Sequence, residues 1–95
     1  MDEYARRLLG TRPDVEQIIV FGSFETGTYA PGSDLDVFIV MSRSERPVRE
    51  RIRELLPGPF PVPMDVFPYT HAEMASLTPP LLLDAVARSR WSYRR

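Results

Sequence analysis

The 95-residue sequence contains no cysteine, no lysine and only one histidine. Without cysteine, disulfide bonds and thiolate metal sites are excluded. The twelve basic residues are all arginine, and thirteen aspartates and glutamates offset them to a formal net charge of −1. A nearly neutral chain without a polybasic surface is not expected to bind nucleic acid on its own.

Long apolar runs are also missing. No segment approaches the roughly 18 apolar residues that a membrane span requires. The first residues, Met1 to Tyr4, are acidic and lack the layout of a signal peptide. We therefore expect a cytoplasmic protein without membrane contact. With 43% apolar and 26% charged residues, the composition is typical of a globular protein, and the length allows one domain over residues 1–95.

The remaining pattern predicts helices and strands that alternate around a small sheet. Short runs rich in Val, Ile and Phe are typical of buried strands, whereas segments with one apolar side are typical of helices. We expect strands at Val15–Phe21, Leu35–Met41 and Met64–Phe67. We expect helices at Asp2–Leu9, Ser23–Thr28, Arg46–Leu56, from Thr70 or His71 to near Leu77, and from Pro79–Pro80 to about Arg90. This order favours an α/β or α+β domain with three or four strands.

Three aspartates are the candidate catalytic residues. Asp34 and Asp36 stand two positions apart at the head of a predicted strand, so their side chains point to the same face while Leu35 points into the core. Asp65 lies between two apolar residues of the next predicted strand and points away from them. If that strand pairs beside the one that carries Asp36, the three carboxylates come together.

Such a group of carboxylates suits a divalent metal ion. Phosphoryl transfer builds negative charge on oxygens, and Mg²⁺ offsets this charge while aligning the attacking and leaving oxygens. Hard oxygen ligands without His or Cys favour Mg²⁺ or Mn²⁺ over zinc. We predict two Mg²⁺ ions, with Mn²⁺ as a substitute, held by Asp34, Asp36 and Asp65.

The Gly22-Ser23 pair ends the first predicted strand and provides a second candidate feature. Glycine permits a tight turn and lets a phosphate approach the backbone. Exposed amide groups at the start of a following helix, together with the Ser23 hydroxyl, form an anion site. Alone, Gly-Ser is most often a simple turn and Asp-x-Asp is most often a solvated strand end. Their ordered combination with a later hydrophobic-Asp-hydrophobic segment carries the prediction.

These motifs resemble the signature of the DNA polymerase β-like nucleotidyltransferase superfamily. The matching stretches are Gly22-Ser23-Phe24-Glu25-Thr26-Gly27 and Ser33-Asp34-Leu35-Asp36-Val37. The chain is most similar to the minimal nucleotidyltransferases, small proteins often encoded beside a HEPN-domain partner, although many of them carry Arg where this chain has Thr26. The resemblance implies the nucleotidyltransferase fold, with a small mixed sheet of three to four strands and flanking helices.

The resemblance also implies roles for individual residues. It implies that Asp34 and Asp36 hold metal ions, and that Asp65 completes the site and helps to activate the acceptor hydroxyl. The nucleotide-binding residues that it implies are Gly22, Ser23 and Ser33.

The activity implied is transfer of AMP from ATP to a hydroxyl group, in some systems that of a tyrosine on the HEPN partner. The chain would then be the antitoxin of a toxin–antitoxin pair. Two alternatives stay open. One is a non-catalytic module that keeps the fold and binds a partner. The other is a nucleotidyltransferase for a small molecule or tRNA, which would need a second subunit to recognise its substrate.

The other polar and aromatic residues have simpler interpretations. We expect His71 to be a helix cap or a surface residue. The arginines between Arg43 and Arg53 alternate with glutamates and predict a solvated helix face, with contact to nucleotide or partner as the alternative. Trp91 and Tyr93 predict a frayed tail that packs one aromatic ring; the alternative is a partner or oligomer surface through the C-terminal helix.

Overall fold

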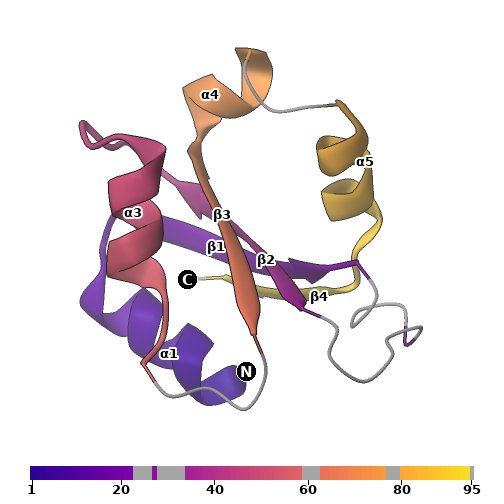
Figure 1. The fold of residues 1–95 in the computed structure, drawn as a ribbon, viewed down its shortest axis with the longest axis horizontal. Coiled ribbons are helices and arrows are strands. Elements are labelled where there is room, and N and C mark those ends of the chain that lie inside the picture. Colours follow the sequence, from indigo (N-terminus) through magenta and orange to yellow (C-terminus); the bar gives the residue numbers. More distant parts are fainter. Residues whose placement is uncertain (23–26, 28–33, 59–62, 77–79, 95) are drawn as a thin grey trace.

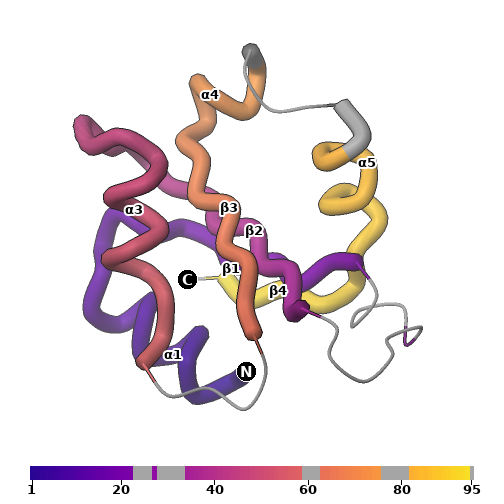
Figure 2. The backbone as a smooth tube through the Cα atoms, in the orientation of Figure 1, coloured from indigo at the N-terminus to yellow at the C-terminus, as the bar shows by residue number. Residues whose placement is uncertain are grey.

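The protein was analysed as a computed structural model, which describes residues 1–22, 27, 34–58, 63–76 and 80–94. Its described strands form one mixed sheet, and Figures 1 and 2 show helices on both sides of it. The elements are α1 (Asp2–Thr11), β1 (Val15–Phe21), β2 (Leu35–Met41), α3 (Val48–Leu55), β3 (Met64–Thr70), α4 (His71–Ser76), α5 (Pro80–Arg88) and β4 (Trp91–Arg94). The predicted α/β architecture is confirmed, whereas the helix predicted at Ser23–Thr28 lies outside the described residues.

The sheet has the strand order β3-β2-β1-β4. The central strands β1 and β2 are antiparallel, β4 is antiparallel to β1, and β3 is parallel to β2. A parallel pair needs a crossover connection, and α3 lies in the connection between β2 and β3. Both central strands have the bounds that the sequence predicts.

Alternate residues of the central strands divide the core into two halves. Ile18 and Val20 point to the face covered by α1 and α3, while Ile19 and Phe21 point to the face covered by α4 and α5. We call these the α1/α3 face and the α4/α5 face. Strands that are buried on both faces lose the polar alternation of a surface strand, which is why β1 and β2 are nearly continuous apolar runs in the sequence.

The first helix is fixed to the α1/α3 face by a buried hydrogen bond. The Tyr4 hydroxyl donates to the Leu55 carbonyl of α3 over 2.6 Å, and burial raises the pKa of Tyr4 to about 12. Leu8 is buried beside it, so the predicted apolar side of α1 is confirmed.

In the described residues, no helix is long and apolar enough to cross a membrane.

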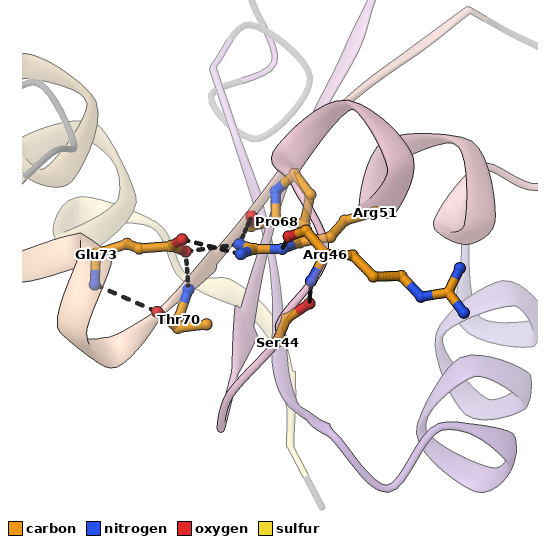
Figure 3. Close-up of polar contacts among 6 residues, drawn as sticks. All are labelled: Ser44, Arg46, Arg51, Pro68, Thr70 and Glu73. Carbon is orange, nitrogen blue, oxygen red and sulfur yellow. Dashed lines mark hydrogen bonds and ion pairs between the residues drawn. The ribbon is translucent and has the colours of Figure 1, made fainter.

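One arginine of the predicted solvated face is in fact buried. Arg51 is only 3% exposed, because its guanidinium bonds both carboxylate oxygens of Glu73, at 2.6 and 2.9 Å (Figure 3). It also donates to the carbonyls of Arg46 and Pro68. The prediction of a fully solvated basic face was wrong at this position, because the partner lies on another helix.

Glu73 also organises the start of α4. Its carboxylate accepts the Thr70 N–H over 2.8 Å, and the Thr70 hydroxyl accepts the Glu73 N–H over 3.3 Å (Figure 3). This reciprocal pair is a capping box, which explains why the helix starts at His71 as predicted. His71 itself is exposed and lies 3.0 Å from a Glu16 carboxylate oxygen, so it is a surface residue.

The C-terminal segment is the second correction. Trp91–Arg94, predicted as a frayed tail, forms β4 and pairs with Gln17–Val20 of β1. The Trp91 indole N–H donates to the Tyr93 hydroxyl over 2.9 Å, and that hydroxyl is hydrogen bonded to Asp2 of α1. Both aromatic side chains pack against the α1/α3 core, which orders the segment.

Candidate active site

Strand pairing brings the candidate carboxylates together at one end of the sheet. Asp36 of β2 is in register with Asp65 of β3, and on its other side with Phe21 of β1. Asp34 directly precedes β2 and is exposed, as is Asp65, whereas Asp36 is partly buried. The condition set by the sequence, that the third strand lies beside the second, is therefore met.

Two of the three carboxyl groups, those of Asp36 and Asp65, have raised pKa values. Burial raises the pKa of Asp36 above its ordinary value, and the negative charges of Asp65 and Asp34 raise it further. The pKa of Asp65 is raised first by partial desolvation, and then by the charge of Asp34 and a hydrogen bond with it. Like charges held this close favour the protonated form of a carboxyl group or a bound cation.

Gly22 shapes the position of the Asp36 carboxylate. Its φ angle is +79°, which disfavours any residue with a Cβ. A Cβ at this position would lie 2.5 Å from Asp36 Oδ2, so the carboxylate rests against the bare backbone of the turn. The sequence argument explained this glycine by the turn and by phosphate approach; the contact with Asp36 is a further reason that only the structure reveals.

Aromatic side chains form the floor behind the carboxylates. Phe21 and Phe67 have ring centroids 5.6 Å apart, and Phe38 and Tyr69 stack at 5.7 Å. These residues belong to the α4/α5 core, the face to which Asp36 also points by alternation. An apolar floor desolvates a carboxylate and strengthens its attraction to a cation. We did not assign these aromatics to the site from the sequence, although the spacing of two from Asp36 to Phe38 and from Asp65 to Phe67 was visible there.

The remaining predicted site residues cannot be compared with the structure. Ser23, Ser33 and the family departure at Thr26 lie outside the described residues, so their contact with nucleotide stays a prediction. The roles of Gly22 and the three aspartates also stay predictions, although the structure does show where these four residues lie.

The three candidate aspartates offer carboxylate oxygens, which suit a hard metal ion. Carboxylate oxygens are the ligands that Mg²⁺ prefers, and Mg²⁺ usually keeps water and substrate oxygens as further ligands. Among the described residues, no group of three or more His, Cys, Asp and Glu side chains is arranged to hold an ion by itself. A Mg²⁺ site at the aspartates is therefore still a prediction.

An apolar groove of about 420 Å³ runs beside Asp65. It lies between α3 and the outer side of β3. Its lining residues are Val48, Ile52, Leu56, Met64, Asp65, Val66, Phe67 and Tyr69. Asp65 is the one charged residue among these described lining residues, so the groove borders one of the candidate catalytic residues.

The sequence and the fold are each similar to those of known proteins. Residues 2–79 match the family of nucleotidyltransferase domains. The fold is similar to the crystal structure of a proposed nucleotidyltransferase from Sulfolobus solfataricus, with a TM-score of 0.58 and 23% sequence identity. The match covers 77% of this chain and 66% of that chain, slightly less than two thirds of its length. The comparison with curated proteins found no match. Because the family match spans most of the sequence, this chain belongs to the nucleotidyltransferase domain family.

Proposed function

We propose that this chain transfers AMP from ATP to a hydroxyl group of an acceptor, with Asp34, Asp36 and Asp65 as the catalytic residues. The observation that carries the proposal is the register of β2 and β3, which aligns Asp36 with Asp65 next to the glycine turn at Gly22. The family match supports nucleotidyl transfer in general, and the choice of ATP rests on the resemblance of the motifs to minimal nucleotidyltransferases.

The reaction forms one bond and breaks one. The acceptor oxygen bonds to the α-phosphorus of ATP, while the bond from that phosphorus to the oxygen bridging the β-phosphate breaks. Pyrophosphate leaves with the bonding electron pair, and the acceptor proton passes to the Asp65 carboxylate. Asp65 is the carboxylate in register with Asp36, at the exposed edge of the sheet, where an acceptor can reach it.

The metal would be held by the three aspartates. Mg²⁺, when bound, offsets the negative charge of the triphosphate and of the leaving pyrophosphate. The residues of this chain hold the carboxylates in place: the β2–β3 ladder fixes Asp36 and Asp65, and the backbone of Gly22 leaves room for Asp36. Gly22, Ser23 and Ser33 are the proposed contacts to the phosphates.

The proposed acceptor is a hydroxyl group on a HEPN-domain partner protein, which would make the chain a cytoplasmic antitoxin. This rests on the motif resemblance.

The test is transfer of label from ATP that carries it on the α-phosphate. The chain is incubated with Mg²⁺ and the product of the neighbouring gene, and the label on each protein is measured. We expect label on the partner with the native chain and none with Asp36→Asn. The matched control is Asp84→Asn, the same chemical change at an exposed position on α5, which should transfer normally. Full function in cells with all three aspartates replaced by asparagine would instead favour the non-catalytic binding module.

A further inference from the structure

The outer edge of β3 carries main-chain groups that the sheet does not use. Leu35 N donates to the Pro63 carbonyl over 2.8 Å, and Leu35 is in register with Met64. In a parallel ladder this arrangement turns the odd-numbered residues of β3 toward β2 and the even-numbered residues outward. Because β3 is the edge strand, the outward groups face away from the sheet.

The C-terminal half of this edge is closed. Pro68 has no N–H to offer, and its carbonyl accepts a hydrogen bond from Arg51 over 3.2 Å. The Thr70 N–H is bonded to the Glu73 carboxylate. A proline together with capping of the free groups is how proteins protect an edge from pairing with another strand.

The N-terminal half of the same edge is open. The outward groups here belong to Met64 and Val66, one residue to each side of Asp65. The outward C=O of Pro68 and the outward N–H of Thr70 are hydrogen bonded to side chains. In the described part of the chain, the outward N–H and C=O groups of Met64 and Val66 have no such hydrogen bond. Two N–H and two C=O groups are thus left for a ligand next to a candidate catalytic carboxylate.

An apolar strip of α3 runs along this open half. Val48, Ile52 and Leu56 are spaced by four, so they lie on one side of the helix, and they line the groove beside Asp65. Leu56 is 42% exposed. An extended chain placed against the edge would cover this strip with one of its faces.

We propose that an extended segment of a partner polypeptide pairs with Met64–Val66 of β3 and presents a hydroxyl side chain to Asp65. Alternating N–H and C=O groups are matched by the backbone of another strand, and not by a small alcohol or by the end of an RNA. Since side chains of a strand alternate between its faces, the segment would direct its hydroxyl to the Asp65 face and apolar side chains to the α3 strip. The inference rests on the proposed transfer and specifies the class of its acceptor.

Binding can be tested separately from chemistry. The probe is a peptide of eight alternating valines and glutamines, flanked by arginine, with one central glutamine replaced by tyrosine, serine or threonine. It is titrated into the ¹⁵N-labelled full chain, and amide shifts are followed by NMR. We expect the largest shifts at Met64, Val66 and Leu56. A peptide with N-methylated backbone, which cannot form the ladder, should bind at least tenfold more weakly.

The matched variants are Leu56→Glu and Arg53→Gln. Each lowers the net charge by one, Arg53 within α3 and Leu56 directly after its last residue, and both residues are exposed. We expect Leu56→Glu to reduce both peptide binding and transfer of label from ATP at least tenfold, with unchanged ATP binding. Arg53→Gln should behave like the native chain.

The outcomes separate the two proposals. Shifts centred on another surface, or none at millimolar peptide, would overturn the docking inference. Label on a small alcohol or an RNA end that Leu56→Glu leaves unchanged would also overturn it, while the transfer itself would stand. Shifts at the β3 edge with no label on any acceptor would overturn the transfer and leave the edge as a polypeptide-binding surface.

Discussion

At the two ends of β3, the pKa values of nearby carboxyl groups are shifted in opposite directions. At its C-terminal end, the Glu73 carboxylate is bonded by the buried guanidinium of Arg51, which lowers the pKa of Glu73 to about 2. At its N-terminal end, burial and the neighbouring carboxylates raise the pKa of Asp36 and of Asp65, and no ion pair joins either of them to a cation of the described residues. The first charge is balanced within the chain to stabilise the fold. The second is left unbalanced, as expected where the balancing cation comes with a ligand.

The largest effect that we expect is on activity and comes from the unbalanced end. Asp36→Asn should reduce nucleotidyl transfer on the order of 10³-fold, because the metal interactions that it weakens supply several kcal/mol to the transition state. The variant should unfold no earlier than the native chain, since it relieves repulsion between like charges. Label transfer and thermal unfolding measure the two effects. A loss of activity accompanied by a large loss of stability would contradict a purely functional role.

At the C-terminal end of β3, where Arg51 pairs with Glu73, we expect a mutation to change stability and not activity. Arg51→Ala removes the guanidinium that pairs with the Glu73 carboxylate, together with a buried side chain, which should lower the free energy of unfolding by about 3 kcal/mol. Below the unfolding transition, transfer per folded molecule should stay close to native. Chemical denaturation gives the stability. The control is Arg49→Ala, an exposed arginine of the same helix, which should cost less than about 0.5 kcal/mol.

A third prediction concerns the turn that supports Asp36. Gly22→Ala should lower the rate of nucleotidyl transfer by about 10²-fold, because the new Cβ would displace the Asp36 carboxylate. A misplacement of about 1 Å in a catalytic group can reduce the rate by that factor. Gly27→Ala is the matched control, because Gly27 has the same φ of +79° but nothing within 4 Å of a Cβ. Both variants should lose about 1–2 kcal/mol of stability through backbone strain. Equal losses of activity in the two would refute the contact with Asp36 as the cause.

The smallest effect should appear in the pH dependence of stability. The folded-state pKa of Glu73 is about 2, below its ordinary 4.5. Its contribution is therefore complete above pH 4.5 and is lost as the pH falls toward 2. Because the Glu73 carboxylate is partly exposed, solvent screening limits this loss to about 1 kcal/mol. Asp36 has a raised pKa and the opposite sign, so its protonation in acid favours the fold.

Denaturation at a series of pH values between 6 and 3 distinguishes these contributions. Glu73→Gln should flatten the loss of stability in acid, and Asp36→Asn should make it steeper. If both variants shifted the profile in the same direction, the contrast between the two ends of β3 would not hold.

The sequence predicted the strand bounds well where both faces of a strand are buried. The bounds of β1 and β2 were predicted because both faces of these strands are buried, which leaves unbroken apolar runs. The alternation around Leu35 and Asp36 was likewise readable, since a strand has a period of two. The three candidate carboxylates followed from this alternation and from the motif.

Features that depend on distant partners could not be predicted. Arg51 is a charged residue among charged neighbours, and only its contact with Glu73, 22 positions later, reveals its burial. β4 is short and polar on one side, so its own sequence does not predict a strand. It forms a strand because it pairs with β1. β3 continues past Phe67 through Pro68, which is compatible with a strand because its nitrogen, which carries no hydrogen, lies on the unpaired side of an edge strand, although its side chain is buried.

The parallel pairing of β2 and β3 makes the candidate site sensitive to a slip of one residue. Val66 is buried in the α1/α3 core, while its neighbour Asp65 is exposed. A shift of β3 by a single position would exchange their faces, so that a carboxylate would enter the core and a valine would take its place beside Asp36. The same apolar packing that stabilises the sheet therefore keeps the candidate carboxylates aligned. Insertions in the segment joining α3 to β3 should leave the carboxylates aligned as long as this packing holds the register.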